Sequence, residues 1–237
     1  MNSKIALVTG ANKGIGFEVA RQLSGKGFTV LLGARDQQRG EEAAAKIPGA
    51  TFIALDLNEP ETALAAAKEI DQKYGHLDVL VNNAGIVDFS DGLPGVANLD
   101  AVRKTFDTNF FGALYVSQAM LPLLRKSPAA RIVNVSSTLG SIAKQNNPAN
   151  PYAAFASIGY SGSKAALNML TVNLAQELRE TPAKVNSACP GYVATDINRH
   201  SGPRTVEQGA AIIVHLATLE ADGPTGGFFD DGGSIPW

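Results

Sequence analysis

The sequence has little cysteine: its 237 residues include one, Cys189. No intrachain disulfide can form, and the place of Cys189 between Ala188 and Pro190 at a predicted strand end indicates packing rather than reactivity. Long apolar runs are also missing, because none approaches the roughly 18 residues of a membrane span. Residues 1–4 lead into a strand without the apolar core of a signal peptide. We therefore expect a cytoplasmic protein with no membrane partner.

The chain has no large excess of charge of either sign. Its 20 Lys and Arg residues nearly balance its 22 Asp and Glu residues, for a net charge of −2 and a pI of about 5.9. This balance lacks the basic surplus typical of nucleic-acid-binding proteins, so no nucleic-acid partner is expected. His76, His200 and His215 lie in unrelated segments without metal-ligand spacing. We predict no catalytic metal.

Repeats, low-complexity linkers and a second-domain boundary are absent too, and we expect one domain over residues 1–237. Short apolar runs alternate with helical patterns, which predicts an α/β Rossmann fold with a doubly wound, mostly parallel sheet of about seven strands flanked by helices. The expected strands cover residues 4–8, 28–33, 51–55, 77–81, 131–135, 184–188 and 227–230. The expected helices cover residues 15–25, 39–47, 60–74, 100–126, 158–180 and 205–219.

A tyrosine and a lysine stand four residues apart in Tyr160-Ser161-Gly162-Ser163-Lys164, within a helical pattern. Side chains at this spacing share a helix face. An ammonium group beside a phenol favours the phenolate, so Lys164 is expected to lower the pKa of Tyr160 from its usual value of about 10. Such a pair can be an ordinary surface contact, but none of the other four tyrosines has a lysine at this spacing. Tyr160 is therefore a candidate general acid and base.

A glycine-rich segment, Thr9-Gly10-Ala11-Asn12-Lys13-Gly14-Ile15-Gly16, follows the first apolar run. It predicts a strand, a tight turn and the start of a helix whose apolar stripe comprises Ile15, Val19 and Leu23. Glycine permits positive φ in the turn and lets the backbone approach a pyrophosphate, whose charge the helix N-terminal amides meet.

Together, the glycine segment and the Tyr/Lys pair resemble the short-chain dehydrogenase/reductase family, whose motifs read T-G-x-x-x-G-x-G and Y-x-x-x-K. The resemblance extends over nearly the whole chain. Three further segments match family motifs in the same order: Asn82-Asn83-Ala84-Gly85, the strand Ile132-Val133-Asn134-Val135-Ser136-Ser137, and Pro190-Gly191. The segment Gly33-Ala34-Arg35-Asp36 resembles the NADPH-preferring carbonyl reductase branch of the family.

The resemblance implies a set of site residues. In the strand motif the second serine, Ser137 rather than Ser136, matches the catalytic serine, and Asn109 matches a helix-borne active-site asparagine. The expected catalytic residues are Asn109, Ser137, Tyr160 and Lys164. The expected cofactor-binding residues are Gly10, Asn12, Lys13, Gly14, Ile15, Gly16, Arg35, Asp56, Leu57, Asn83, Ala84, Gly85, Tyr160, Lys164, Pro190, Gly191, Val193 and Thr195. The expected substrate contacts are Ser137, Leu139, Tyr160 and Tyr192.

Cofactor preference depends on charge after the second expected strand. An NAD site needs an acceptor for the ribose 2′-hydroxyl, whereas an NADP site needs cations for the 2′-phosphate. Ala34 stands where NAD-preferring relatives carry an aspartate, and Arg35 and Lys13 supply two cations, which favours NADPH over NADH. Asp36 favours the opposite choice, because it lies about 20 residues beyond the glycine motif.

The mechanism implied by the resemblance is reversible hydride transfer between NADPH and the carbonyl carbon of a small-molecule ketone or aldehyde. Tyr160 would protonate the developing alkoxide, and Ser137 would donate a hydrogen bond to it. Lys164 would also bind the nicotinamide ribose, and Asn109, through its backbone and a water, would link Lys164 to bulk solvent.

The segments expected to be loops differ most from the family pattern. Residues 86–99 and 192–204 follow expected strand ends and are candidate substrate walls. Residues 144–151 read as an inserted loop, followed by a stretch with Tyr152 and Phe155. Inserts at this place resemble the carbonyl reductase branch, which has monomeric members, so a dimer, a tetramer and a monomer all remain open.

Two other functions remain open from the sequence. One is a reductase of 3-oxoacyl thioesters on an acidic carrier protein, for which Arg103, Arg199 and Arg204 are the candidate docking cations. The other is a catalytically silent NADP sensor or scaffold, which predicts loss of Ser137, Tyr160 or Lys164. All three residues are present.

Overall fold

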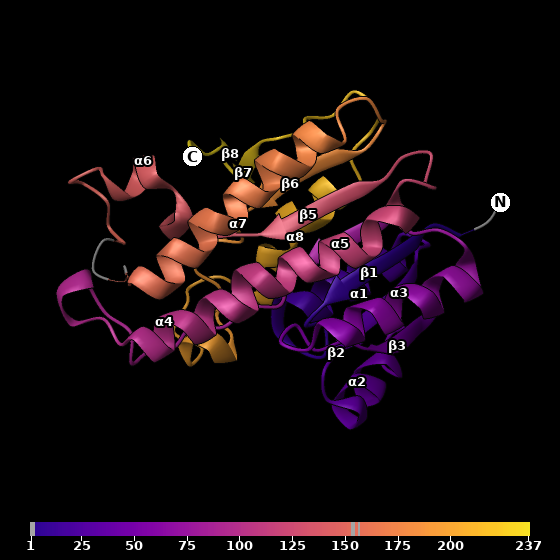
Figure 1. The fold of residues 1–237 in the computed structure, drawn as a ribbon, viewed down its shortest axis with the longest axis horizontal. Helices are drawn as coiled ribbons and strands as arrows, with labels where there is room; N and C mark the ends of the chain where they lie inside the picture. Colours follow the sequence, from indigo (N-terminus) through magenta and orange to yellow (C-terminus); the bar gives the residue numbers. More distant parts are fainter. Residues whose placement is uncertain (1–2, 153–154, 156) are drawn as a thin grey trace.

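The computed structural model describes residues 3–152, 155 and 157–237, and Figure 1 shows the arrangement of its helices and strands. Its sheet has the strand order β3-β2-β1-β4-β5-β6-β7-β8. The strands are β1 (Ile5–Thr9), β2 (Thr29–Ala34), β3 (Ala50–Ala54), β4 (Val79–Asn82), β5 (Arg131–Val135), β6 (Lys184–Ala188), β7 (Phe228–Asp230) and β8 (Gly233–Ser234). The parallel α/β prediction is confirmed, with one short antiparallel strand, β8, added at the edge.

The helices are α1 (Gly14–Gly25), α2 (Gln37–Ala44), α3 (Pro60–Tyr74), α4 (Leu99–Phe106), α5 (Ala113–Leu124), α6 (Ile142–Gln145), α7 (Ile158–Glu177) and α8 (Val206–Ala217). Short 3-10 turns are η1 (Pro94–Val96), η3 (Thr138–Gly140) and η5 (Asp196–Asn198). The helix expected over residues 100–126 is α4 and α5 joined by a π-helical segment, η2 (Asp107–Gly112). The loop expected from Lys144 starts within α6, and part of the stretch after it lies outside the described residues.

Helix ends follow local sequence signals. Asp36 caps α2 by accepting a hydrogen bond from the Arg39 amide, and Pro60 opens α3, where a missing N–H costs nothing. Gly75 ends α3 in the left-handed conformation, at φ 76°. These signals explain why the expected boundary residues 60 and 74 agree with the structure.

Two layers of helices cover the sheet, because successive strand side chains point to opposite faces. Leu7 belongs to the cluster on one face, with side chains of α3, α5 and α7. Val8 belongs to the cluster on the other face, with side chains of α1, α2 and α8. Figure 1 shows α5 and α7 inclined in nearly the same direction across the view.

Helix α7 carries apolar side chains on more than one side. Leu167, Leu170 and Leu174 are buried against the sheet, whereas Met169 is 58% exposed in the single chain. In the described ranges no helix combines the length and hydrophobicity needed to cross a bilayer.

Candidate active site

The topology brings β1 and β4 together at the point where the strand order reverses. From β1 the chain proceeds to β2 and β3 on one side, and from β4 to β5, β6 and β7 on the other. In open parallel sheets of this kind, ligands bind beyond the carboxyl ends of the strands at this reversal. The glycine segment follows β1 and Asn83 follows β4, so both predicted motifs lie there.

The glycine turn has the backbone geometry that its sequence predicts. Gly10 and Gly14 have φ values of +63° and +60°, which favour glycine. A Cβ on Gly16 would lie 2.4 Å from the Asn83 side-chain nitrogen and 2.7 Å from the Gly10 carbonyl oxygen. The turn therefore packs too closely for a side chain at Gly16.

The start of α1 is open to an anion. Its N-cap residue, Lys13, has an extended backbone and makes no side-chain capping hydrogen bond. The first amide groups of a helix carry partial positive charge and favour phosphate when no side chain occupies them. Asn12 and Ile15 flank this turn and are both half-buried. The geometry fits a dinucleotide pyrophosphate.

The Asn82-Asn83-Ala84-Gly85 segment is tied to the end of β1. The Thr9 hydroxyl accepts hydrogen bonds from the amides of Asn83 and Ala84, both at 3.0 Å. The Asn83 side chain donates back to the Thr9 carbonyl at 2.9 Å. These bonds hold the two expected cofactor-binding segments together across the reversal point.

Ser137, Tyr160 and Lys164 come together from β5 and α7. Ser137 ends the strand motif, is half-buried, and its Oγ accepts a hydrogen bond from the Leu139 amide at 3.2 Å. Ser136 is buried against the Lys164 backbone instead. Lys164 Nζ donates to the Val135 carbonyl at 2.8 Å and lies 5.8 Å from the centre of the Tyr160 ring.

The expected lowering of the Tyr160 pKa is wrong for the protein alone. Burial raises the pKa of Tyr160 to about 12, with a further rise from the neighbouring Cys189 thiol, while hydrogen bonding with Ser137 opposes the change. Burial also lowers the pKa of Lys164 to about 8, against an opposing effect of Cys189. Loss of water at both groups outweighs any attraction between them.

The pKa of Lys164 predicts a pH-dependent stability. Below pH 8 both the folded and the unfolded chain hold the lysine proton, so the full cost of burying the charge is present. Between about pH 8 and 10.5 the unfolded chain binds the proton more tightly, and the wild-type free energy of unfolding rises with pH. Lys164→Met removes this buried charge, so its free energy of unfolding at pH 7 should exceed that of the wild type. The difference between the two proteins is expected to shrink by about 3 kcal/mol between pH 7 and 10.5. Urea denaturation at both pH values measures this difference, and a pH-independent difference contradicts the assigned pKa.

Asn109 lies in the π-helical segment η2 and binds the loop after β4. Its Oδ1 accepts a hydrogen bond from the Ile86 amide at 2.8 Å, and its Nδ2 donates to the Ile86 carbonyl and to Ser163 Oγ. A Cβ on Gly85 would lie 3.2 Å from Asn109 Oδ1 and 3.4 Å from Lys164 Nζ. Asn109, Gly85 and Lys164 thus converge at one place.

Arg35 and Asp36, which follow β2, differ in whether their side chains are already bound to other residues. Arg35 is exposed and makes no ion pair within the described part of the chain. Asp36 caps α2 at the Arg39 amide and also pairs with the Arg39 side chain at 3.8 Å. After β3, the Asp56 carboxylate accepts a hydrogen bond from the Asn58 amide. Leu57 is buried and packs against Gly112.

The segment after β6 folds over the glycine turn. Gly191 has a φ of +76° after Pro190, and Val193 is buried against Gly209. Thr195 Cγ2 lies 3.7 Å from where a Cβ of Gly14 would be. Tyr192 Oη and Ser201 Oγ lie 2.5 Å apart, and the Tyr192 and Phe155 rings have centroids 5.9 Å apart.

Two contacts in this region have no counterpart in the sequence prediction. Lys13 Nζ pairs with Asp196 Oδ2 at 2.5 Å, so the glycine turn is tied to the loop that follows Pro190. His200 lies 2.8 Å from the other Asp196 oxygen. No local pattern indicates the Lys13–Asp196 pair, because its two residues lie 183 positions apart in the sequence.

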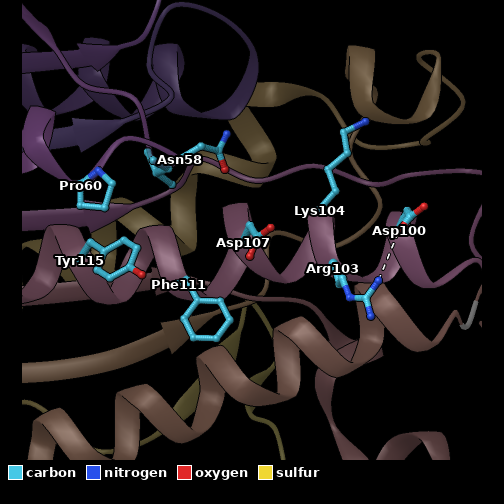
Figure 2. Close-up of a pocket in the computed structure, with 9 residues that line it drawn as sticks. Asn58, Pro60, Asp100, Arg103, Lys104, Asp107, Phe111 and Tyr115 are labelled. Atoms are coloured by element: carbon cyan, nitrogen blue, oxygen red, sulfur yellow. Dashed lines mark hydrogen bonds and ion pairs between the residues drawn. The ribbon is translucent and has the colours of Figure 1, made fainter.

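A hollow of about 670 Å³ lies between the segment after β3 and the continuous helical rod formed by α4, η2 and α5. Ser137, Tyr160 and Lys164 do not line it. Figure 2 shows Asp107, Phe111 and Tyr115 along the rod, with Asn58 and Pro60 opposite them. Of its nine lining residues only Leu57 belongs to the predicted site. In the part of the chain that the structure describes, no cluster of three or more His, Cys, Asp or Glu could hold a metal ion.

The fold and the meeting of Ser137, Tyr160 and Lys164 define the class of Rossmann-like α/β oxidoreductases. Residues 4–205 match the short chain dehydrogenase family, and the chain belongs to this family. The family uses nicotinamide dinucleotides, NAD(H) or NADP(H), and the turn at α1 and the open helix start fit such a group.

Curated relatives are similar over most of their length. The chain is 38% identical to the short-chain dehydrogenase anuI of Penicillium roqueforti, covering 90% of this chain and 88% of that protein. It is 35% identical to carbonyl reductase [NADPH] 3 of Mus musculus, covering 93% and 92%. The solved structure of salutaridine reductase from Papaver somniferum superposes with a TM-score of 0.83 at 30% identity, covering 96% of this chain and 99% of that one.

The comparison with the mouse enzyme also shows a difference in length. That alignment runs over 260 positions, more than the 237 residues of this chain, so the mouse protein has segments that this chain lacks.

Proposed function

We propose that this protein is an NADPH-dependent reductase of ketones or aldehydes, acting reversibly, with Tyr160 as its general acid and base. The observation that carries the proposal is the convergence of Ser137, Tyr160 and Lys164 beside the two segments tied together at Thr9. NADPH, when bound, supplies a hydride to the carbonyl carbon.

The chain's own residues would handle the oxygen and its proton. Ser137 is half-buried at the end of β5 and can donate a hydrogen bond to the substrate oxygen. Tyr160 then gives its proton to that oxygen as negative charge develops there. The raised pKa of Tyr160, about 12, keeps the phenol protonated at neutral pH, which suits an acid.

Lys164 and Asn109 would support this step. Lys164 is held by the Val135 carbonyl with its ammonium group near the Tyr160 ring, where its charge stabilises a phenolate once the proton has left. Asn109 holds the Ile86 backbone and Ser163, and Ser163 in turn donates to the Tyr160 carbonyl at 2.8 Å. The proposed link from Lys164 to solvent through Asn109 remains an expectation from the family.

A preference for NADPH over NADH is supported by the contacts of the two charged residues that follow β2, Arg35 and Asp36. Arg35 is exposed and available for a 2′-phosphate, whereas Asp36 is occupied by the Arg39 amide and side chain. A carboxylate already engaged in this way is a poorer acceptor for a ribose hydroxyl. If a bound dinucleotide displaced Lys13 from its ion pair with Asp196, the Lys13 ammonium group would be a second cation for the 2′-phosphate.

The cations considered for a carrier protein are each engaged elsewhere. Arg103 pairs with Asp100 at 3.3 Å and Arg204 pairs with Asp231. Arg199 lies 5.7 Å from the centre of the Phe89 ring. This engagement favours a free carbonyl compound over a carrier-bound thioester, and the retained Ser137, Tyr160 and Lys164 favour an enzyme over a silent sensor.

The test is the loss of reduced-nicotinamide absorbance with NADPH and NADH against a panel of ketones, aldehydes and 3-oxoacyl thioesters, with Tyr160→Phe as the blank. Turnover of simple carbonyls with NADPH, absent from the blank, supports the proposal. Tight NADPH binding without turnover of any substrate supports the sensor, and turnover of thioesters alone supports the carrier-linked enzyme.

Arg35→Ala is expected to lower kcat/KM for NADPH by about 10-fold to 100-fold, the value of one or two charge-assisted hydrogen bonds to a phosphate. The value for NADH should change little, because NADH has no 2′-phosphate. Steady-state kinetics with both cofactors measure this ratio, and Arg39→Ala is the matched comparison, since Arg39 already pairs with Asp36. Equal losses with the two cofactors contradict a phosphate contact at Arg35.

A further inference from the structure

The helix that carries Tyr160 has no cap from its own sequence. Its N-cap residue, Ser157, has an extended backbone and makes no side-chain capping hydrogen bond. The first amides of a helix have no partner within the helix and need one from elsewhere. Tyr160 is in this first turn, so whatever holds these amides also holds the tyrosine.

The missing cap comes from the loop between β4 and α4. Asp91 Oδ2 accepts a hydrogen bond from the Gly159 amide at 2.6 Å, and the Gly92 carbonyl accepts one from the Ile158 amide at 3.0 Å. Figure 1 shows the loop that precedes α4 lying close to the start of α7. Asp91 therefore acts as an N-cap supplied 68 residues away in the sequence.

Close packing makes this contact specific. A Cβ on Gly159 would lie 2.7 Å from Asp91 Oδ2 and 3.0 Å from the Cα of Val102 in α4. One turn later, a Cβ on Gly162 would lie 3.2 Å from the Phe106 ring. The first turn of α7 is thus seated against the loop and α4, and Gly159 leaves room for the carboxylate.

The other aspartate of the loop segment before Gly92 makes different contacts. Asp88 binds the Ser90 hydroxyl and amide and pairs with Lys104 at 3.1 Å, and these contacts lower the pKa of Asp88 to about 2. Of these side-chain partners, Ser90 lies in the loop and Lys104 lies in α4, so neither belongs to α7. Of these two carboxylates, Asp91 is the one that reaches the helix of Tyr160.

We propose that Asp91 is a positioning residue for Tyr160, which couples the loop over residues 86–99, a candidate substrate wall, to the placement of the acid. This inference rests on the proposed function of Tyr160. Because Asp91 touches the Gly159 amide rather than the phenol, it acts through the helix. A change in the loop would therefore alter the rate of proton transfer as well as the fit of a substrate.

The experiment compares Asp91→Ala, Asp91→Asn and Asp100→Ala. Asp91→Ala is expected to lower kcat by about 10-fold to 100-fold with little change in KM for NADPH, because a small displacement of a reacting group costs rates of this order. Asp91→Asn should recover most of kcat, since asparagine caps a helix about as well as aspartate. Asp100 is the control for loss of a nearby charge, because it is an exposed first-turn residue of α4 whose carboxylate pairs with Arg103 among the described residues.

A wild-type kcat in Asp91→Ala, or an equal loss in Asp91→Asn, overturns the inference while leaving the proposed function intact. Hydrogen exchange over residues 157–162 tests the cap without any substrate. Exchange there should be faster in Asp91→Ala than in wild type and unchanged in Asp100→Ala. Wild-type exchange in Asp91→Ala overturns the inference even if no carbonyl substrate is found, in which case the proposed function has failed separately.

Discussion

Replacement of Tyr160 by phenylalanine is expected to slow carbonyl reduction by about 100-fold to 10,000-fold, the usual contribution of a positioned general acid. Only the hydroxyl is lost, and the ring remains in its place on α7 beside Lys164. NADPH should bind the variant with nearly the wild-type affinity. Absorbance assays give kcat, and quenching or enhancement of nucleotide fluorescence gives the affinity.

Tyr115→Phe is the matched control, because Tyr115 lies on the exposed side of α5 and lines the hollow in Figure 2. It should retain wild-type kcat. A loss of rate below about 10-fold in Tyr160→Phe would be smaller than the contribution of a general acid. Such a result would rule out proton donation by Tyr160.

Gly10→Ala is expected to lower the free energy of unfolding by about 2 to 5 kcal/mol. Two effects add at this position. A left-handed φ of +63° is costly for any residue with a Cβ, and that Cβ would lie 2.9 Å from both the Cα and the Cβ of Ala84. Urea denaturation without nucleotide measures the loss.

Gly14→Ala separates the two effects. Gly14 has nearly the same φ, +60°, but among the described residues its Cβ would meet only Thr195 Cγ2, at an ordinary contact distance of 3.7 Å. This variant should lose only the conformational part, about 1 to 2 kcal/mol. Equal losses in the two variants would show that contact with Ala84 contributes nothing, and that the segments after β1 and β4 are less closely packed than described.

Much of this fold could be predicted because its signals are local. Alternating apolar runs predicted all seven parallel strands and the principal helices, since a strand or helix buries the face that its own periodicity creates. The glycine turn was equally readable, because positive φ at Gly10 and Gly14 is a property of single residues.

Other features could not be read in this way. The π-helical segment at Asp107–Gly112 lies within one continuous helical pattern, and the pattern contains nothing that divides it. The direction of the Tyr160 pKa was predicted wrongly, because four-residue spacing reports the neighbour Lys164 but not the burial that dominates both groups.

The sequence by itself determined the family, the α/β class and the identity of the candidate catalytic groups, because motif order and periodicity are written along the chain. The tertiary structure decided how those groups are held. Lys164 binds the Val135 carbonyl, Asp36 is occupied by Arg39, and Asp91 caps the helix of Tyr160. Hydrogen bonds and burial depend on which distant segments meet in space, and that meeting is a property of the packed sheet and its helices.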